Sequence, residues 1–347
     1  MALMTGNEQP LVQSRRHVAN PDAGGMTGID PRLATADNYR RFAQREAAGR
    51  SPAYESLAFA VADDPVVLAY LQSLPSGKRQ PNLLFAAARY LLESVPRIGD
   101  LRQLILEQQD GLRTVMMDRR TQTNEPARCA TLLPALSLLP QPLALIEVGA
   151  SAGLTLLPDR YAYDYGAVGV AGADPLAPTL PCTLRSPAPL PEHTPEVVWR
   201  RGIDLNPLDP ADDEDVLWLE CLIWPGESGR VDRLHRAVEA ARRCPVPVHQ
   251  GDLLDDLATM VAEAPRDGTV VVYHSAVLAY VDRDKRQQFS QLVRNLDVTW
   301  LSNEAPAVLD WVPAAGITEG FALIQDGEHL LAETDPHGTW LRWEAPR

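Results

Sequence analysis

The sequence predicts an α/β protein in which a mostly parallel sheet with a C-terminal antiparallel hairpin follows an all-α region. Three observations support this prediction. Residues 36–140 carry apolar positions at helical spacing and show no strand-like alternation. From residue 143 onward, short apolar runs alternate with amphipathic segments, which is typical of a parallel sheet. Near the end, two apolar runs flank Asp326-Gly327, a pair that favours a tight hairpin turn.

The N-terminal part divides into a tail and a helical region. Residues 1–35 are polar and contain several Gly and Pro residues, which predicts a flexible tail. Residues 36–140 predict a helical domain or a cap over the rest of the chain. One of its helices is expected to open at Asp64-Pro65. The last is expected to start with Asn124 as N-cap and Pro126 in the first turn.

Residues 141–347 predict the α/β domain. Five strands are expected in its sheet: 143–148, 197–203, 246–249, 269–274 and 298–302. A short helix is expected at 152–159, and four longer helices are expected at 212–223, 229–243, 253–263 and 284–295. The C-terminal strands are expected at 321–325, 330–333 and 339–343. A Pro-rich insertion at about 166–196 shows no clear periodicity, and loops of this length are usually functional or disordered. A brief strand at 161–165 precedes it.

Composition excludes several kinds of partner. The chain has 46 acidic and 32 basic residues, a formal net charge of −14. An acidic surface disfavours binding to nucleic acid and to anionic membranes. No apolar stretch is long enough to span a bilayer, and no secretory signal is recognisable. We therefore expect a cytoplasmic protein with a small-molecule substrate, and the sequence leaves its oligomeric state open.

Residues 143–154 are the stretch on which the functional interpretation depends. An apolar run reaches Glu147 and then opens into five small residues, Gly149-Ala150-Ser151-Ala152-Gly153. A buried strand followed by a tight turn into a helix start exposes main-chain N–H groups beside the positive end of a helix dipole. Small side chains also let a ligand approach the backbone closely. The stretch therefore predicts a ligand site.

Three motifs compete for this turn. The dinucleotide fingerprint G-x-G-x-x-G fits poorly, because Ser151 takes the second glycine position and Leu154 the sixth. The nucleophile elbow G-x-S-x-G of α/β hydrolases matches letter for letter. The stretch also resembles the nucleotide loop of S-adenosylmethionine-dependent methyltransferases, in which acidic-x-G-x-G-x-G follows the first strand, with one Gly-to-Ser change.

The order of the later landmarks favours a methyltransferase-like Rossmann domain. A helical region precedes the turn where a hydrolase would have strands and an oxyanion loop. The resemblance implies S-adenosylmethionine as cofactor and a set of cofactor-binding residues: Glu147, Gly149, Ser151, Gly153, Asp204 and Asp252. It implies that Asp204 accepts from the ribose hydroxyls and that Asp252 lies beside the adenine amino group. Asp164 is the alternative ribose partner if 161–165 is the second strand. Each carboxylate also has a structural interpretation as a turn or helix cap.

The carboxyl ends of the fourth and fifth strands supply the catalytic candidates, because ligands of open α/β sheets bind at strand ends. His274 ends the fourth strand and Glu304 follows the fifth, so either is a candidate general base. Asn303, Asn124 and Glu125 are candidate substrate-binding residues, the last two as part of a lid with Arg128. The structural alternatives are a hydrogen-bonded histidine at a strand end and a helix cap with a surface ion pair.

Several motifs together resemble a bacterial family of unknown function over about residues 36–344. They are Arg79–Leu84, Gln122–Glu125 with Arg128–Ala130, Glu147–Leu154, Arg201–Pro207 and Tyr273–Leu278. The resemblance implies a helical N-terminal region before a methyltransferase-like domain, and it brings no established activity. The recurrence of Asn124-Glu125 and Asn303-Glu304 among its motifs favours them as site residues.

The leading hypothesis is a methyltransferase that uses S-adenosylmethionine and acts on a small molecule. One alternative is a serine hydrolase with Ser151 as nucleophile and His274, His329 or His337 as base. The other alternative is a non-catalytic ligand-binding protein of the same fold. The substrate is not identified by any motif, and no metal site is expected.

Overall fold

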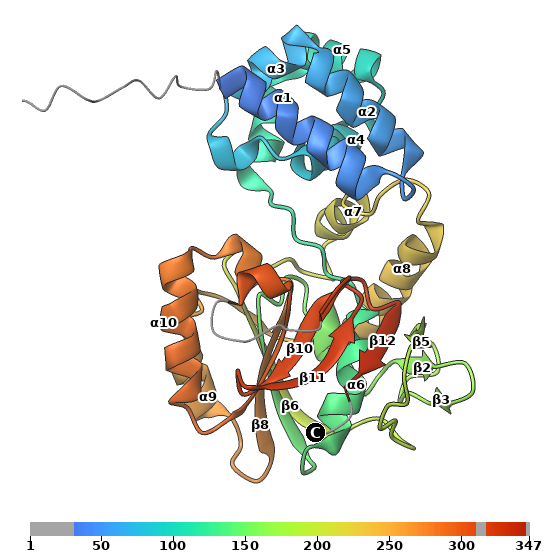
Figure 1. Ribbon diagram of the computed structural model, residues 1–347, viewed down its shortest axis with the longest axis vertical. Coiled ribbons are helices and arrows are strands. Elements are labelled where there is room, and N and C mark those ends of the chain that lie inside the picture. Colours follow the sequence, from blue (N-terminus) through green and yellow to red (C-terminus); the bar gives the residue numbers. More distant parts are fainter. Residues whose placement is uncertain (1–30, 310–316, 345–347) are drawn as a thin grey trace, which may run out of the picture.

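Proline starts three helices of the N-terminal region, α2, α3 and α4, where its fixed φ suits the first helical turn and its missing N–H costs nothing. At α3 the Asp64 carboxylate also caps the helix by accepting from Val66 N and Val67 N. In the computed structural model, which describes residues 31–309 and 317–344, this region stands apart from the sheet (Figure 1). Its elements are α1 (Pro31–Phe42), η1 (Ala43–Ala47), α2 (Pro52–Asp63), α3 (Pro65–Gln72), η2 (Ser76–Lys78), α4 (Pro81–Leu92) and α5 (Ile98–Asp118). Helix α1 begins within the segment 1–35 predicted as a tail, and residues 1–30 lie outside the described part.

The helical region has its own aromatic core around Phe85 on α4. The Phe85 ring lies 4.9 Å from that of Tyr54 and 6.0 Å from those of Tyr39 and Phe42, between ring centroids. These rings come from α1, α2 and α4, so burial of one aromatic cluster joins three helices. The prediction of a helical N-terminal region is confirmed.

The helix before the sheet, α6 (Arg128–Leu138), starts later than predicted. Its N-cap position is Ala127, which has no side-chain cap bond. The prediction that Asn124 caps this helix is wrong, because the Asn124 amide oxygen instead accepts from the main-chain N–H of Leu154 at 2.9 Å. Asn124 therefore connects the segment before α6 to the turn after the first strand of the sheet.

Within the described residues, the main sheet has nine strands in the order β5-β12-β11-β10-β9-β8-β1-β6-β7. Five neighbouring strands are mutually parallel: β1 (Leu143–Val148), β6 (Val197–Asp204), β7 (Val248–Gln250), β8 (Thr269–Ser275) and β9 (Thr299–Glu304). The antiparallel strands are β10 (Phe321–Gln325), β11 (His329–Thr334) and β12 (Trp340–Trp343). The α/β class, the mostly parallel sheet and the C-terminal hairpin are confirmed, with strand boundaries close to the predicted ones.

The central strand β1 is buried along its whole length. Because side chains alternate across a strand, Leu143 and Leu145 join the core on one face, while Ile146 and Val148 join the core on the other. Helices α9 (Leu257–Glu263) and α10 (Arg283–Arg294) pack on the second face. Both faces of the sheet are thus covered, as the continuous apolar run predicts.

The insertion between β1 and β6 contains more regular structure than predicted. Strands β2 (Ala162–Asp164), β3 (Gly169–Val170) and β4 (Thr179–Pro181) form a separate three-stranded sheet, and β5 (Thr183–Leu184) pairs with β12 at the edge of the main sheet. The brief strand predicted at 161–165 exists as β2, but it lies outside the main sheet.

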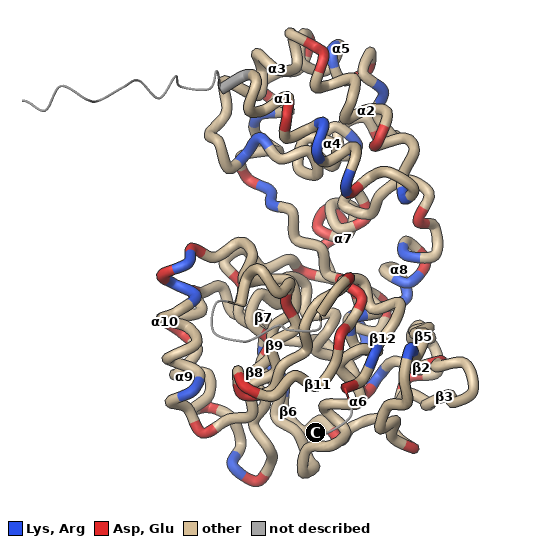
Figure 2. The backbone as a smooth tube through the Cα atoms, viewed as in Figure 1, with Lys and Arg blue, Asp and Glu red and all other residues tan. Residues whose placement is uncertain are grey.

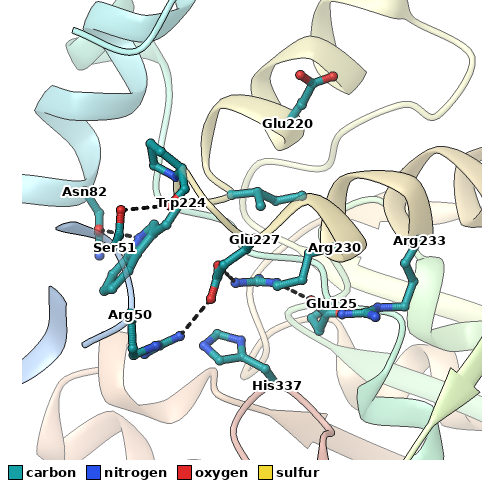
Figure 3. Close-up of polar contacts among 12 residues, drawn as sticks. Arg50, Ser51, Asn82, Glu125, Glu220, Trp224, Glu227, Arg230, Arg233 and His337 are labelled. Atoms are coloured by element: carbon teal, nitrogen blue, oxygen red, sulfur yellow. Dashed lines mark hydrogen bonds and ion pairs between the residues drawn. The ribbon is translucent and has the colours of Figure 1, made fainter. Parts of the chain in front are cut away.

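Helices α7 (Asp213–Cys221) and α8 (Ser228–Arg243) connect the sheet to the helical region (Figure 1). Between them, Trp224 packs its ring 5.3 Å from Phe42 and donates from Nε1 to Asn82 Oδ1 at 3.0 Å. The neighbouring Pro225 carbonyl accepts from Ser51 Oγ at 2.9 Å (Figure 3). The two parts therefore meet through specific packing and hydrogen bonds. Among the described helices, none is long and apolar enough to cross a membrane.

Candidate functional site

A cavity of about 510 Å³ lies between the helical region and the carboxyl ends of β1, β6 and β8. The strand order reverses beside β1, because the chain goes from β1 outward to β6 and β7 and then crosses to β8 on the other side. Such a reversal opens a crevice at the carboxyl ends of the strands, where ligands of open α/β sheets bind. The volume falls in the range of small-molecule sites.

The sheet contributes the small residues of the turn after β1 to this cavity. Gly149 and Ser151 line it. Gly149 has φ +72°, and a Cβ at this position would lie 2.4 Å from Val277 Cγ2, so only glycine fits. Ser151 has φ +52°, and its buried Oγ has no hydrogen-bond partner among the described residues. Gly153 also has a positive φ, but it contacts Val246 and Val248 and does not line the cavity.

The expected helix start after this turn is wrong. Only the three-residue η3 (Leu154–Leu156) follows it, so there is no long helix whose dipole could act on a ligand. Several main-chain N–H groups of the turn are also already bonded within the protein: those of Gly149 and Ala150 donate to Ile203 O, and that of Gly153 donates to Ala150 O. The turn thus lets a ligand approach the main chain closely, but it offers few free N–H groups to bind one.

Asp204 ends β6 and lines the cavity, as the ribose prediction requires. Its Oδ2 accepts from Ser151 N at 2.8 Å, and its Oδ1 accepts from Asn206 N at 2.8 Å and from Gln122 Nε2 at 3.1 Å. The Gln122 amide comes from the connector between α5 and α6 and also bonds Asn206. Asp164 is exposed on β2 and binds Gly166 N, away from the cavity, so Asp204 is the carboxylate that the fold places at the site.

Glu147 is buried beside the cavity wall without lining it. Its Oε1 accepts from Thr155 Oγ1, and its Oε2 has no partner among the described residues. Burial raises the pKa of Glu147 to about 8, and this effect outweighs the hydrogen bond from Thr155 and the attraction of Arg128. The side chain is therefore mostly protonated at neutral pH.

Asp252 follows β7 and does not line the cavity, although its neighbours Gly251 and Leu253 do. Its Oδ1 accepts from Leu254 N at 2.9 Å, and its Oδ2 lies 3.2 Å from Lys285 Nζ. In this structure the carboxylate forms a turn and a surface ion pair.

The strand-end candidates His274, Asn303 and Glu304 form a fully buried cluster and do not line the cavity. Glu304 Oε1 accepts from His274 Nδ1 at 2.8 Å and from Val277 N at 2.8 Å. Asn303 bonds the side chains of Ser275 and Thr334. The cluster holds β8, β9 and the segment after β8 together. The structure therefore does not bring the predicted catalytic pair, His274 and Glu304, to the cavity.

Glu125 lies in a buried network of ion pairs, not in the main cavity. It is 3% exposed and binds Arg230 Nε at 2.6 Å and Arg233 Nε at 2.7 Å. Burial raises the pKa of this carboxyl, but the two arginines outweigh burial and hold the pKa below its usual value. Asn124 and Glu125 thus fix the segment before α6, whereas Arg128, one turn later, reaches the cavity.

Sequence reasoning missed most of the cavity's basic wall. That wall consists of Arg50, Lys78, Arg120, Arg128 and Arg230. His337, in the turn between β11 and β12, lies with them; Gly338 beside it approaches Ala127 so closely that a Cβ would lie 2.1 Å from the Ala127 carbonyl oxygen. Of these residues, Arg128 was singled out from the sequence as part of a motif, and His337 as a candidate base of the hydrolase alternative. The others come from distant segments that share no local pattern.

The fold and the cavity define a class: an α/β protein with a cavity at the topological switch point of its sheet, lined also by residues of an N-terminal helical region. More particularly, the chain belongs to the bacterial family described as "Uncharacterized protein conserved in bacteria (DUF2332)", which matches residues 36–98 and 96–343. No curated protein and no solved structure matches the chain.

Proposed function

We propose that the protein is an S-adenosylmethionine-dependent methyltransferase that acts on a small molecule. The observation that carries this proposal is the meeting of the turn after β1 with Asp204 at the end of β6 inside one cavity. The parallel strands follow the order β7-β6-β1-β8-β9, which is the order of a Rossmann half-sheet extended past its switch point. The sequence motif and the strand order thus both favour a cofactor site at the carboxyl ends of the parallel strands.

The residues at this end fit the proposed cofactor in size and shape. Gly149 permits close approach to the main chain, and Ser151 Oγ is an unpartnered polar atom in the wall. Asp204 would hold the ribose hydroxyls, and we expect the Gln122 amide to release its Oδ1 when they bind. Glu147 is mostly protonated and is buried beside the cavity wall without lining it, so it would act on the cofactor only indirectly. Asp252 and Gly153 would support the cofactor only through the turns that they form.

The proposed reaction needs positioning more than acid–base chemistry. When bound, S-adenosylmethionine would supply an electrophilic methyl group: in-line displacement by the acceptor atom would break the S–CH3 bond and leave S-adenosylhomocysteine. The protein must hold the acceptor in line and exclude water, and the helical region closes the cavity from the side opposite the sheet. His337 is the histidine of the cavity lining; burial lowers its pKa to about 3, so it is neutral at physiological pH.

The hydrolase alternative lacks support at Ser151. A serine nucleophile needs a base within hydrogen-bond reach, and Ser151 Oγ has no partner in the described part of the chain. A non-catalytic binding protein would use the same cavity. It differs from a methyltransferase only in turnover, so a transfer assay separates the two.

Titration calorimetry with S-adenosylhomocysteine tests the cofactor site. We expect saturable binding to the full chain and a loss of at least about tenfold in affinity for Asp204→Asn, because a charged acceptor is removed. The matched control is Asp164→Asn, which removes an exposed carboxylate outside the cavity and should bind as the wild type. Absence of binding at millimolar ligand, or equal losses in both variants, would refute the proposal.

A further inference from the structure

The cavity wall carries an excess of positive charge in a chain whose net charge is −14. Five basic side chains line it, and its acidic lining residues are Glu46 and Asp204. Clefts lined by one sign of charge concentrate ligands of the opposite sign. Figure 2 shows Lys and Arg positions along the connector between the two parts and on α8.

Arg128 is a buried cation that bonds only main-chain carbonyls in the described part of the chain. It is 8% exposed, and its guanidinium donates to two main-chain carbonyls, from Nε to Pro336 O at 2.9 Å and from Nη1 to Ser275 O at 3.0 Å. No carboxylate of the described residues lies within ion-pair distance of it. Burial lowers the pKa of Arg128, and the more distant carboxylates of Glu125 and Glu304 offset this effect only in part. Glu147, which acts on its charge less than they do, is mostly protonated at neutral pH. A buried guanidinium without a paired carboxylate is costly unless a ligand supplies the negative charge.

Arg230 and Arg50 extend the positive wall toward the helical region (Figure 3). Both bind Glu227: Arg230 Nη1 at 2.6 Å and Arg50 Nη2 at 3.4 Å. Arg230 also shares Glu125 with Arg233. This network thus has three guanidinium groups for two carboxylates and retains one positive charge.

His337 adds a neutral donor to the same place. Its ring lies beside Arg50 and Arg230 (Figure 3), and its buried Nδ1 has no partner among the described residues. Burial and then the charges of Arg230 and Arg128 lower the pKa of His337 to about 3. A neutral imidazole beside arginines can donate one N–H to an anion without adding to their mutual repulsion.

We propose that Arg128, Arg230 and His337 bind an oxyanionic group, a carboxylate or a phosphate, on the substrate. The apolar wall formed by Leu83, Leu222 and Trp224 then faces the rest of the molecule. The substrate class is therefore a small organic acid or phosphate ester with an apolar portion. That this anion is the methyl acceptor rests on the proposed function; that the cavity binds an anion does not.

Calorimetry with inorganic phosphate and with malonate tests the anion site on the full chain, and the two probes distinguish the two oxyanions. We expect at least one of them to bind saturably. Arg230→Gln should lower the affinity for that probe at least tenfold, whereas Arg233→Gln should change this affinity by less than twofold. Both variants remove one ion pair to Glu125 from the same helix, and Arg230→Gln also removes the ion pair to Glu227; of the two arginines, Arg230 lines the cavity. Thermal unfolding checks that both are folded, and His337→Asn provides a second cavity variant. No saturable binding, or equal losses in the Arg230 and Arg233 variants, overturns the proposal.

A second arm separates the acceptor site from the cofactor site. The probe is titrated again in the presence of saturating S-adenosylhomocysteine. If its affinity is unchanged or higher, the bound anion belongs to the methyl acceptor. Competitive displacement overturns that assignment, because the arginines would then bind the cofactor's own carboxylate. Probe binding without any binding of S-adenosylhomocysteine supports the anion site and overturns the proposed methyl transfer.

Discussion

The main-chain N–H of Ser151 donates to Asp204 Oδ2 at 2.8 Å, which ties the turn after β1 to the end of β6. The same carboxylate binds Gln122 of the connector from the helical region. Asp204 thus links the sheet, the turn and the cap at one point of the cavity. Ligand binding at Asp204 is therefore expected to affect the contact between the two parts of the protein.

Gly149→Ala should damage the turn. The added methyl group would meet Val277, and the positive φ strains any residue with a Cβ. We expect a loss of about 1–3 kcal/mol in the free energy of unfolding and weaker binding of S-adenosylhomocysteine. Gly111→Ala in α5 is the control, since a methyl group there would have no neighbour within 4 Å and alanine favours a helix. Urea unfolding measures both, and equal stability of the two variants would contradict the account of the turn.

Glu147→Gln should change how stability depends on pH. The folded-state pKa is raised from 4.5 to about 8, so between these values the folded protein holds a proton that the unfolded chain has lost. Stability from this group is thus lost as pH rises from about 4.5 to about 8, by up to about 1.4 kcal/mol per pH unit. The stability of the variant minus that of the wild type should therefore increase as pH rises across this window. Parallel urea unfolding curves at pH 5.5 and 8 would show it; a constant difference between the proteins would show that Glu147 is not buried as a neutral acid.

Glu125→Ala should cost about 3–5 kcal/mol of stability, because it leaves Arg230 and Arg233 without their shared carboxylate. Asp63→Ala, which removes an exposed partner of Arg40, should cost less than about 1 kcal/mol. Thermal or urea unfolding makes the comparison. If Glu125→Ala leaves stability unchanged and removes only ligand binding, Glu125 is a substrate residue, as the sequence suggested.

Glu304→Gln tests the strand-end cluster. The buried carboxylate accepts from His274 and from the main-chain N–H groups of Val277 and Leu278, so we expect a loss of about 1–3 kcal/mol in stability. Affinity for S-adenosylhomocysteine should change little, because Glu304 does not line the cavity. Unaltered stability together with lost methyl transfer would restore the catalytic assignment that the sequence favours.

Regular patterns predicted the sheet well. The apolar run 143–148 predicts a buried strand, and it is β1, which is buried along its whole length. Asp204 was correctly placed at a strand end because the strand period and the following Asn-Pro turn are local signals.

The site was harder to predict. Asn124 looked like a helix cap, yet it bonds Leu154, which lies 30 residues away. His274 and Glu304 lie at strand ends but pair with each other and do not line the cavity. The basic wall joins Arg50, Arg128 and Arg230 with His337 across the fold, and no spacing in the sequence records which arginines meet. Long-range packing, not local propensity, decides these positions.

A crystal structure of the protein with S-adenosylhomocysteine would show whether the cavity binds the cofactor. We expect ligand density in the cavity against Gly149 and Ser151. The ribose hydroxyls should contact Asp204, and the Gln122 amide should have moved away from that carboxylate. An empty cavity at saturating ligand, or a ligand bound elsewhere with the Gln122–Asp204 hydrogen bond intact, would contradict this expectation.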